Sequence, residues 1–474
     1  MINLSFIIPE IFISLSVMFL LILGVFKKNS FELIHNLSII VLLITGVIVF
    51  NETLDIEKIL LFNGSVVIDY LSSFMKIITL LAAFIVLAIS KNYLDNFKIS
   101  KIEYPILILS SVLGMMVMIS SNDLIVFYMG LELQSLALYV LATFNRNNLK
   151  SSEAGLKYFV LSALSSGLLL YGCSLIYGFS GSTNFEIIAS QLDSNEYALT
   201  FGIVFILVGL AFKISAVPFH MWAPDVYEGS PTTVTLFFTM VPKIAALTVF
   251  IRFLYVPFLE LIDQWQMILV FLSIASMLFG AIAAIGQKNI KRLIAYSSIG
   301  HIGYALAGVA SASNDGIQSS VIYLTIYIVM NLGLFSCLLM LRRNDNYYES
   351  IDDLSGLSKN HPILSFSLLV ILFSLAGIPP LAGFFAKFYI FKAVIEQSMY
   401  FLAIVGLLST VIAAFYYLRI IKIIYFDPEQ EKFDPITSKG IRFSLAFSTL
   451  LILFYFLNPS SLTYFVNIAS KAIQ

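Results

Sequence analysis

FKISAVPFHMWAPDVYEGSPTTVTLFFTMVPKIA, residues 212–245, joins two apolar runs that each carry one lysine, Lys213 and Lys243, and the first run contains Pro218. A charge at the centre of a bilayer costs about 2.5–3.5 kcal/mol and usually marks an ion path or the interior of a helix bundle. Proline disturbs the helix about one turn before it, and broken backbone at membrane depth is tolerated only where protein or a wet cavity covers it. The stretch therefore predicts a helical membrane protein with a hydrated site beside Lys213.

The composition of the whole chain agrees with a membrane location. Of its 474 residues, 59% are hydrophobic and 12% are charged, against about 25% charged residues in soluble domains. The mean hydropathy of +0.94 excludes a soluble globular protein and a disordered one. The net charge of -1 offers no electrostatic basis for binding nucleic acid. We expect a polytopic protein embedded in the lipid bilayer.

Apolar stretches long enough to cross a bilayer, about 17–25 residues, recur along the sequence. They lie at 5–26, 33–50, 69–90, 104–120, 122–143, 155–179, 199–222, 231–252, 266–285, 293–310, 318–341, 362–393, 399–425 and 441–457. Because these runs are continuous rather than alternating, we expect an all-α polytopic protein with about fourteen transmembrane helices. The first stretch lacks the positive region of a signal peptide, so we expect it to be a retained helix. The motif GIPP at 377–380 should break the twelfth span.

The positions of lysine and arginine predict the orientation of these spans, because cytoplasmic loops are enriched in both. Eighteen basic residues fall on one side: Lys27, Lys28, Lys91, Lys98, Lys101, Arg146, Lys150, Lys288, Lys291, Arg292, Arg342, Arg343, Lys359, Arg419, Lys422, Lys432, Lys439 and Arg442. Four fall on the other: Lys58, Arg252, Lys392 and Lys471. We expect the first side to be cytoplasmic and both termini to lie outside.

Five lysines remain inside the predicted spans, whereas only one carboxylate, Glu132, lies well inside a span. The lysines are Lys76, Lys157, Lys213, Lys243 and Lys387. Static salt bridges would need one carboxylate for each deep lysine. The imbalance between three deep lysines and Glu132 favours a series of groups that exchange protons by coupled titration.

The two shallower lysines leave alternatives open. Lys76 lies seven residues into its span, so we expect a structural role in which its side chain reaches the interface. Lys157 and Glu153 are one helical turn apart at the cytoplasmic start of span 6. That spacing fits a surface ion pair on the helix and equally the entrance of a proton relay.

The two broken spans, 7 and 12, lie five spans apart and cross in opposite directions. Two five-helix units, spans 4–8 and 9–13, would then be related by inverted topology, as in many transporters. Glu132 precedes Lys213 in the first unit as His301 precedes Lys387 in the second. His301 is the one histidine deep inside a span, and it could be a relay member or a hydrogen-bonded core residue.

These units divide the chain into four segments. We expect an N-terminal three-helix segment at 1–100, the first repeat at 101–255, the second repeat at 256–426, and a C-terminal loop with the last helix at 427–474. Cys173 and Cys337 stand singly in apolar runs, without the spacing of a disulfide framework, a zinc site or an iron–sulfur site. No nucleotide-binding motif occurs. We therefore expect no cofactor and no metal in this chain.

Three stretches resemble the signatures of the antiporter-like membrane subunits of respiratory complex I. The first is the stretch 212–245 quoted above. The second is KNIKRLIAYSSIGHIGYALAG at 288–308, and the third is LAGIPPLAGFFAKF at 375–388. The resemblance covers nearly the whole chain. Within this family, a lysine at position 387 and the lack of a long C-terminal lateral helix favour one of three sister types.

The resemblance implies roles for individual residues. Glu132 would be the ion-pair partner of Lys213, Lys243 the central bridge, and Lys387 the terminal donor or acceptor. It also implies that Glu153 and Lys157 are relay members.

The expected function is that of a proton-translocating subunit of NADH:quinone oxidoreductase in the bacterial inner membrane. Its partners would be other membrane subunits of the complex, both antiporter-like neighbours and small helical subunits. FMN, iron–sulfur clusters and quinone would be held by partner subunits, and we expect no main quinone site here. The alternatives are a subunit of a multisubunit cation/proton antiporter without redox chemistry, and a scaffold whose buried charges only fix helix register.

Overall fold

The structure is a computed structural model that describes residues 4–27, 29–53, 58–192, 196–343, 346–434 and 438–472. Lys28, one of the basic residues used to predict orientation, lies outside the described residues. The α-helices are α1 (Ile8–Phe26), α2 (Phe31–Thr53), α3 (Tyr70–Asn96), α4 (Glu103–Ile119), α5 (Leu124–Ala142), α6 (Leu149–Ser180), α7 (Phe185–Ala189), α8 (Glu196–Lys213), α9 (Trp222–Gly229), α10 (Thr232–Tyr255), α11 (Ile262–Ile285), α12 (Ile290–Ala310), α13 (Asn314–Leu338), α14 (Leu357–Asn360), α15 (Pro362–Ala376), α16 (Ala382–Glu396), α17 (Tyr400–Phe426), α18 (Lys439–Phe454) and α19 (Ser460–Lys471).

The prediction of a helical membrane protein is confirmed. Within the described part of the chain, eleven helices are long and apolar enough to cross a membrane. Three shorter apolar helices, Glu103–Ile119, Tyr197–Lys213 and Pro362–Ala376, coincide with further predicted spans. The total of about fourteen spans and the inverted repeat stay predictions.

Two short hairpins stand beside the helices. Strand β1 (Ile59–Leu61) pairs antiparallel with β2 (Val66–Ile68), and β3 (Arg342–Arg343) pairs with β4 (Asn346–Tyr347). Both hairpins lie in connections between predicted spans, where polar residues interrupt the apolar pattern. The sequence did not predict them, because two or three residues are too few to show a strand period.

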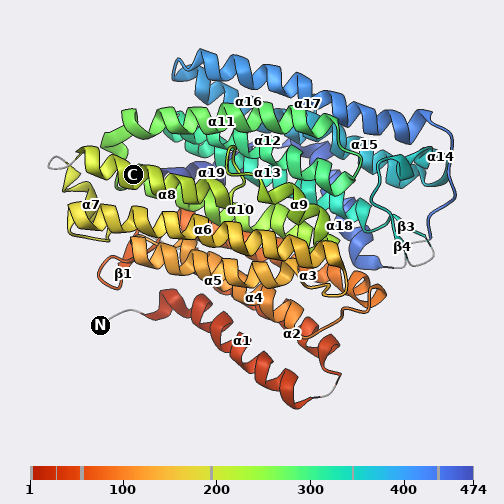
Figure 1. Cartoon of the computed structure of the whole chain (residues 1–474), viewed down its shortest axis with the longest axis horizontal. Coiled ribbons are helices and arrows are strands. Elements are labelled where there is room, and N and C mark those ends of the chain that lie inside the picture. Colours follow the sequence, from red (N-terminus) through yellow and green to blue (C-terminus); the bar gives the residue numbers. More distant parts are fainter. Residues whose placement is uncertain are drawn as a thin grey trace.

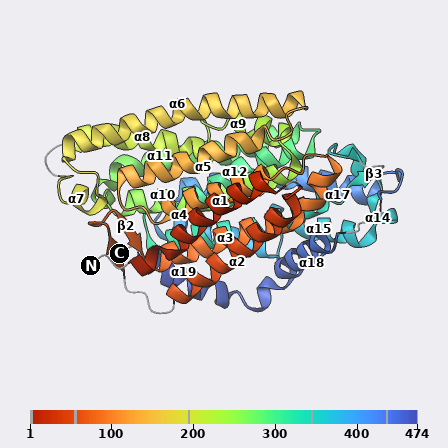
Figure 2. The same ribbon diagram turned by 90° about the horizontal axis from the view of Figure 1, so that it is seen from below.

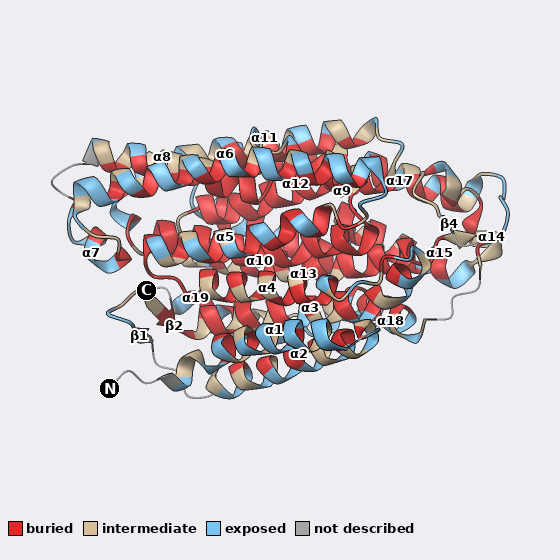
Figure 3. Ribbon diagram, turned by 60° about the horizontal axis from the view of Figure 1, so that its bottom comes forward, coloured by how far each residue is buried: buried red, intermediate tan, exposed pale blue. Residues whose placement is uncertain are grey.

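The long helices run side by side as an elongated bundle (Figure 1), and a second view shows the same arrangement from below (Figure 2). The first turn of α1 and the helix α19 lie at the same end of the bundle in both views. Burial is concentrated in α10, α12 and α13 (Figure 3), and every residue of α10 is buried. The outer helices keep large apolar side chains exposed, as a surface that faces lipid requires.

Both predicted helix breaks are confirmed. Helix α8 ends at Lys213, the chain then takes a left-handed conformation at Ser215 (φ +59°), and α9 begins at Trp222. Helix α15 ends at Ala376, Gly377 has φ +90°, and α16 begins at Ala382. Glycine adopts such a conformation without steric cost. Each break thus places a lysine, Lys213 or Lys387, next to interrupted backbone.

Close contact between α4 and α5 depends on two glycines. A Cβ atom added at Gly114 would lie 2.5 Å from the Gln134 nitrogen, and one added at Gly130 would lie 2.8 Å from the Met118 nitrogen. Small residues allow helix backbones to approach closely in membranes. This approach holds α5, the helix that carries Glu132, against the bundle.

Candidate functional site

Lys213 is held by hydroxyl groups. Its Nζ donates to Ser135 Oγ at 2.8 Å, to Ser162 Oγ at 2.7 Å and to Tyr139 Oη at 3.4 Å. Tyr139 Oη in turn donates to Ser162 Oγ at 2.5 Å. An ammonium has three donors, and here α5 and α6 supply neutral acceptors for all of them. The lysine side chain is buried at the end of α8.

Glu132 lies on the same helix as two of these hydroxyls, one turn before Ser135 and two turns before Tyr139. Its Oε1 is buried without a hydrogen-bond partner. Among the described residues, no direct ion pair joins Glu132 to Lys213. Their pairing, which the resemblance implied, stays a prediction, and Ser135 is the group on α5 that binds the lysine directly.

Lys243 occupies the centre of the fully buried helix α10. Its Nζ contacts Ser298 Oγ of α12, and it lies 5.5 Å from the ring centroid of Tyr327 and 6.0 Å from that of Tyr227. Cations are attracted to aromatic faces at such separations. Within the described residues no carboxylate lies at ion-pair distance from this lysine, so hydroxyl and aromatic groups surround the ammonium.

His301 lies on α12, one turn after Ser298. Its Nδ1 is 2.6 Å from Tyr323 Oη and its Nε2 is 3.1 Å from Tyr417 Oη. Tyr417 Oη also shares a 2.5 Å hydrogen bond with Ser297 Oγ. A neutral imidazole donates from one ring nitrogen and accepts at the other, so His301 can connect two tyrosines in a hydrogen-bonded series.

Lys387 lies in the first half of α16 and points back to the break. Its Nζ donates to the carbonyl oxygens of Leu375 at 3.1 Å and Ala376 at 3.0 Å. These are the last carbonyls of α15, which lack partners within the helix and attract cations. The lysine also lies 5.0 Å from the ring centroid of Tyr304. Lys387 and His301 line the same small cavity, so the structure brings these two predicted residues together.

Lys157 and Glu153 belong to a partly exposed charge cluster at the start of α6. Lys157 Nζ lies 2.6 Å from Glu153 Oε1 and 2.9 Å from Asp225 Oδ2. Arg292 Nη1 lies 2.7 Å from Asp225 Oδ1 and 3.1 Å from Glu228 Oε2. Burial raises the pKa of Asp225, but hydrogen bonds from Lys157 and Arg292 outweigh it and hold this pKa below its ordinary value.

Asp225 and Arg292 were not singled out from the sequence. The signal was present, because Asp225 and Glu228 stand in the stretch 212–245, whose segment 222–229 contains no lysine or arginine. That segment forms the helix α9 between α8 and α10. Pro224 fits there because the first turn of a helix has no internal partner for its N–H groups.

Two buried ion pairs were also missed. Lys76 Nζ lies 2.5 Å from Glu10 Oε1, and both residues are buried. The expectation that Lys76 reaches the interface was therefore wrong, because α1 places a carboxylate beside it. Arg252 donates to both carboxylate oxygens of Asp69 at 3.0 Å. The signal for both pairs is a charge at the edge of an apolar run.

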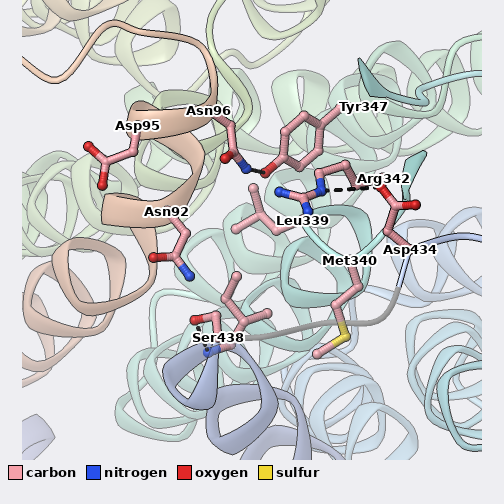
Figure 4. Close-up of a pocket in the computed structure, with 10 residues that line it drawn as sticks. Asn92, Asp95, Asn96, Leu339, Met340, Arg342, Tyr347, Asp434 and Ser438 are labelled. Carbon is pink, nitrogen blue, oxygen red and sulfur yellow. Dashed lines mark hydrogen bonds and ion pairs between the residues drawn. The ribbon is translucent and has the colours of Figure 1, made fainter. Parts of the chain in front are cut away.

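A polar pocket at the end of α3 lies apart from these lysines (Figure 4). In it Asn96 Nδ2 donates to Tyr347 Oη at 3.0 Å, and Arg342 Nε lies 3.6 Å from Asp434 Oδ2. None of the predicted relay residues lines this pocket. Among the described residues, no group of three or more His, Cys, Asp or Glu side chains is arranged to hold a metal ion.

Comparison with known proteins places this geometry in a family context. Residues 121–413 match the family model "NADH:quinone oxidoreductase/Mrp antiporter, TM". The chain is 76% identical to NADH-quinone oxidoreductase subunit N of Pelagibacter ubique, with 98% of each chain covered. It is 49% identical to the subunit of the same name in Paramagnetospirillum magneticum, with 98% of this chain and 97% of that one covered.

A solved structure shares the fold over almost the whole length. It is a chain of respiratory complex I from Thermus thermophilus with bound aureothin, which superposes with a TM-score of 0.82 at 28% identity. The match covers 96% of this chain and 98% of that chain. The fold of this chain is therefore shared over almost the whole length of that subunit.

Proposed function

Since the chain belongs to the NADH:quinone oxidoreductase/Mrp antiporter transmembrane family, we propose that its buried lysines and His301 conduct protons across the membrane. The chain serves as a proton-translocating membrane subunit of an NADH:quinone oxidoreductase complex. The relatives at 76% and 49% identity are both named subunit N, and subunit N is the sister type that the lysine at position 387 favoured.

The observation that carries the proton path is the surroundings of Lys213, Lys243 and Lys387. Each ammonium contacts neutral oxygens, and within the described residues no carboxylate lies at ion-pair distance from any of them. A scaffold would pair each buried charge, because an unpaired buried charge costs far more than a paired one. Groups surrounded by hydroxyls and carbonyls can hold or release a proton without breaking an ion pair.

The packing of the helices supports one order for the proposed path. Helix α8 packs against α10, α10 against α12, and α12 against α16. A proton would pass from the hydroxyls around Lys213 to Lys243 and Ser298, then through His301 and its tyrosines to Lys387. Glu132 would act at the beginning of this path, and Glu153 and Lys157 at its cytoplasmic side.

The redox chemistry of the complex belongs to other subunits in this proposal. NADH, FMN, iron–sulfur clusters and quinone would be bound by partners, and the energy of electron transfer would reach this chain through its contacts with neighbouring membrane subunits. The complex would reside in the bacterial inner membrane, with both termini outside. The family description also covers Mrp antiporters, and the relatives at 76% and 49% identity favour the oxidoreductase.

Replacement of Lys213 tests the path directly. Lys213→Ala removes the ammonium bound by Ser135 and Ser162, so we expect fewer protons pumped per NADH oxidised. The measurement uses the intact complex in sealed vesicles, with assembly checked on native gels. Lys58→Gln is the control, because it removes a half-exposed ion pair to Glu186 far from the lysines. An assembled Lys213→Ala complex with an unchanged ratio would contradict the proposed function.

A further inference from the structure

Asp225 connects two helices that the predicted repeats assign to different units. Its Oδ2 binds Lys157 of α6 at 2.9 Å, and its Oδ1 binds Arg292 of α12 at 2.7 Å. Helix α6 belongs to the predicted first unit and α12 to the second. Since about a third of each of the Asp225 and Arg292 side chains is exposed, water screens this pair less than a fully exposed one.

The helix that carries Asp225 is fixed to the backbone beside Lys213. Trp222, one turn before Asp225, donates its Nε1–H to the carbonyl oxygen of Phe212 at 2.8 Å. The Trp222 ring also stacks on Tyr158 with centroids 4.4 Å apart and planes 9° from parallel. A shift of α9 at Asp225 would therefore reach the carbonyl that directly precedes Lys213.

The helix that carries Arg292 leads to the second part of the path. Helix α12 continues from Arg292 to Ser298, which contacts Lys243, and to His301. Arg292 also binds Glu228, one turn after Asp225 on α9, at 3.1 Å. One nitrogen of Arg292, Nη1, thus contacts two carboxylates of one short helix, and two contacts fix the orientation of that helix better than one does.

On the basis of the proposed proton path, we propose that Asp225 and Arg292 are positioning residues that couple Lys213 to Lys243. Their ion pair holds α9 so that Lys213 stays aligned with its hydroxyl partners while α12 keeps Ser298 at Lys243. The other charges that face Asp225 and Arg292 are Glu153, Lys157 and Glu228, and Lys150 bonds Glu228. Loss of the pair would slow transfer between the two lysines without removing either of them.

The test compares Asp225→Asn, Arg292→Gln and the double variant in the intact complex in sealed vesicles. We expect each single variant to lower the protons pumped per NADH by about 3- to 10-fold, which lies within the range by which mutations in coupled networks change coupling. The double variant should pump about as many protons per NADH as the more impaired single variant, because both substitutions break the same ion pair. Asp225→Glu and Arg292→Lys retain the charges and should recover most of the ratio.

Several results would overturn the coupling role. These are additive losses in the double variant, an unchanged ratio in assembled Asp225→Asn, or charge-retaining variants as impaired as the neutral ones. If Asp225→Asn does not assemble, the comparison of Arg292→Gln with Arg292→Lys decides the question. Lys213→Ala is measured in parallel: a lost ratio there with a normal ratio in Asp225→Asn refutes the coupling role alone, whereas normal ratios in both refute the proton path.

Discussion

At the scale of residues, the three deep lysines are bound by hydrogen bonds to neutral oxygens. Lys213 binds two serines and a tyrosine, Lys243 contacts Ser298, and Lys387 binds backbone carbonyls. Buried ion pairs are present elsewhere, as Arg252 with Asp69 shows. The chain thus has paired charges where α3 meets α10 and hydroxyl- or carbonyl-bound lysines along the proposed path, a difference that supports a structural role for the pair and a conducting role for the lysines.

The stability of the Lys243→Met complex should show whether Lys243 has a structural role or a conducting one. Methionine has a similar length and no charge to desolvate, so we expect the free energy of unfolding to stay the same or rise by about 0–2 kcal/mol while proton pumping is lost. The measurements are the thermal midpoint of the assembled complex and the protons pumped per NADH. A large fall of the midpoint would instead identify Lys243 as a scaffold residue.

Arg252→Met on the same helix is the matched control for Lys243→Met. It removes one partner of a buried pair and leaves Asp69 uncompensated, so we expect destabilisation of about 3–5 kcal/mol. Unlike Lys243→Met, this variant leaves a buried carboxylate without its partner. A similar midpoint in both would contradict the assignment of their roles.

At the scale of elements, helix breaks and close helix contacts position the side chains. Helix α8 packs along α6, and α4 along α5, in the first predicted unit; α11 packs along α12, and α13 against α15 and α16, in the second. The two predicted units therefore share the same pairs of packed helices, and the inverted relation between the units stays a prediction. The unexpected element is α9, whose stacked Trp222 anchors the segment after Lys213.

Gly130→Ala should loosen the contact that holds α5. The added Cβ would meet the Met118 backbone at 2.8 Å, so we expect a cost of about 1–3 kcal/mol and a lower thermal midpoint of the complex. Gly167→Ala is the control, because a Cβ atom there meets nothing within 4 Å and alanine favours a helix by about 0.5–1 kcal/mol. Equal midpoints for both variants would show that α4 and α5 can separate at no cost.

At the scale of the whole molecule, the basic residues predict one cytoplasmic face. In the fold, Lys288 precedes α12 and Glu260 precedes α11, so α11 separates the two positions. Both side chains are exposed, whereas Cys173 and Cys337 are buried and unbonded. The topology can therefore be tested by labelling single cysteines.

We expect Glu260→Cys to react with a membrane-impermeant maleimide from outside the cell, and Lys288→Cys only after the cells are opened. The reason is that loops rich in lysine and arginine stay in the cytoplasm. Reaction of both variants from the same side would contradict the number of spans between them, and a reversed pattern would contradict the orientation.

The sequence by itself determined the class of the protein, the two helix breaks and the lysines beside them. Apolar runs of membrane length, proline and glycine inside them, and charges at depth each have a local physical cause that a single segment reveals. Tertiary structure alone decided what each charge contacts. Ser135 and Ser162 bind Lys213, Glu10 pairs with Lys76, and Asp225 joins α6 to α12. Residues far apart in sequence become neighbours only when helices pack, and a short-range pattern carries no information about that packing.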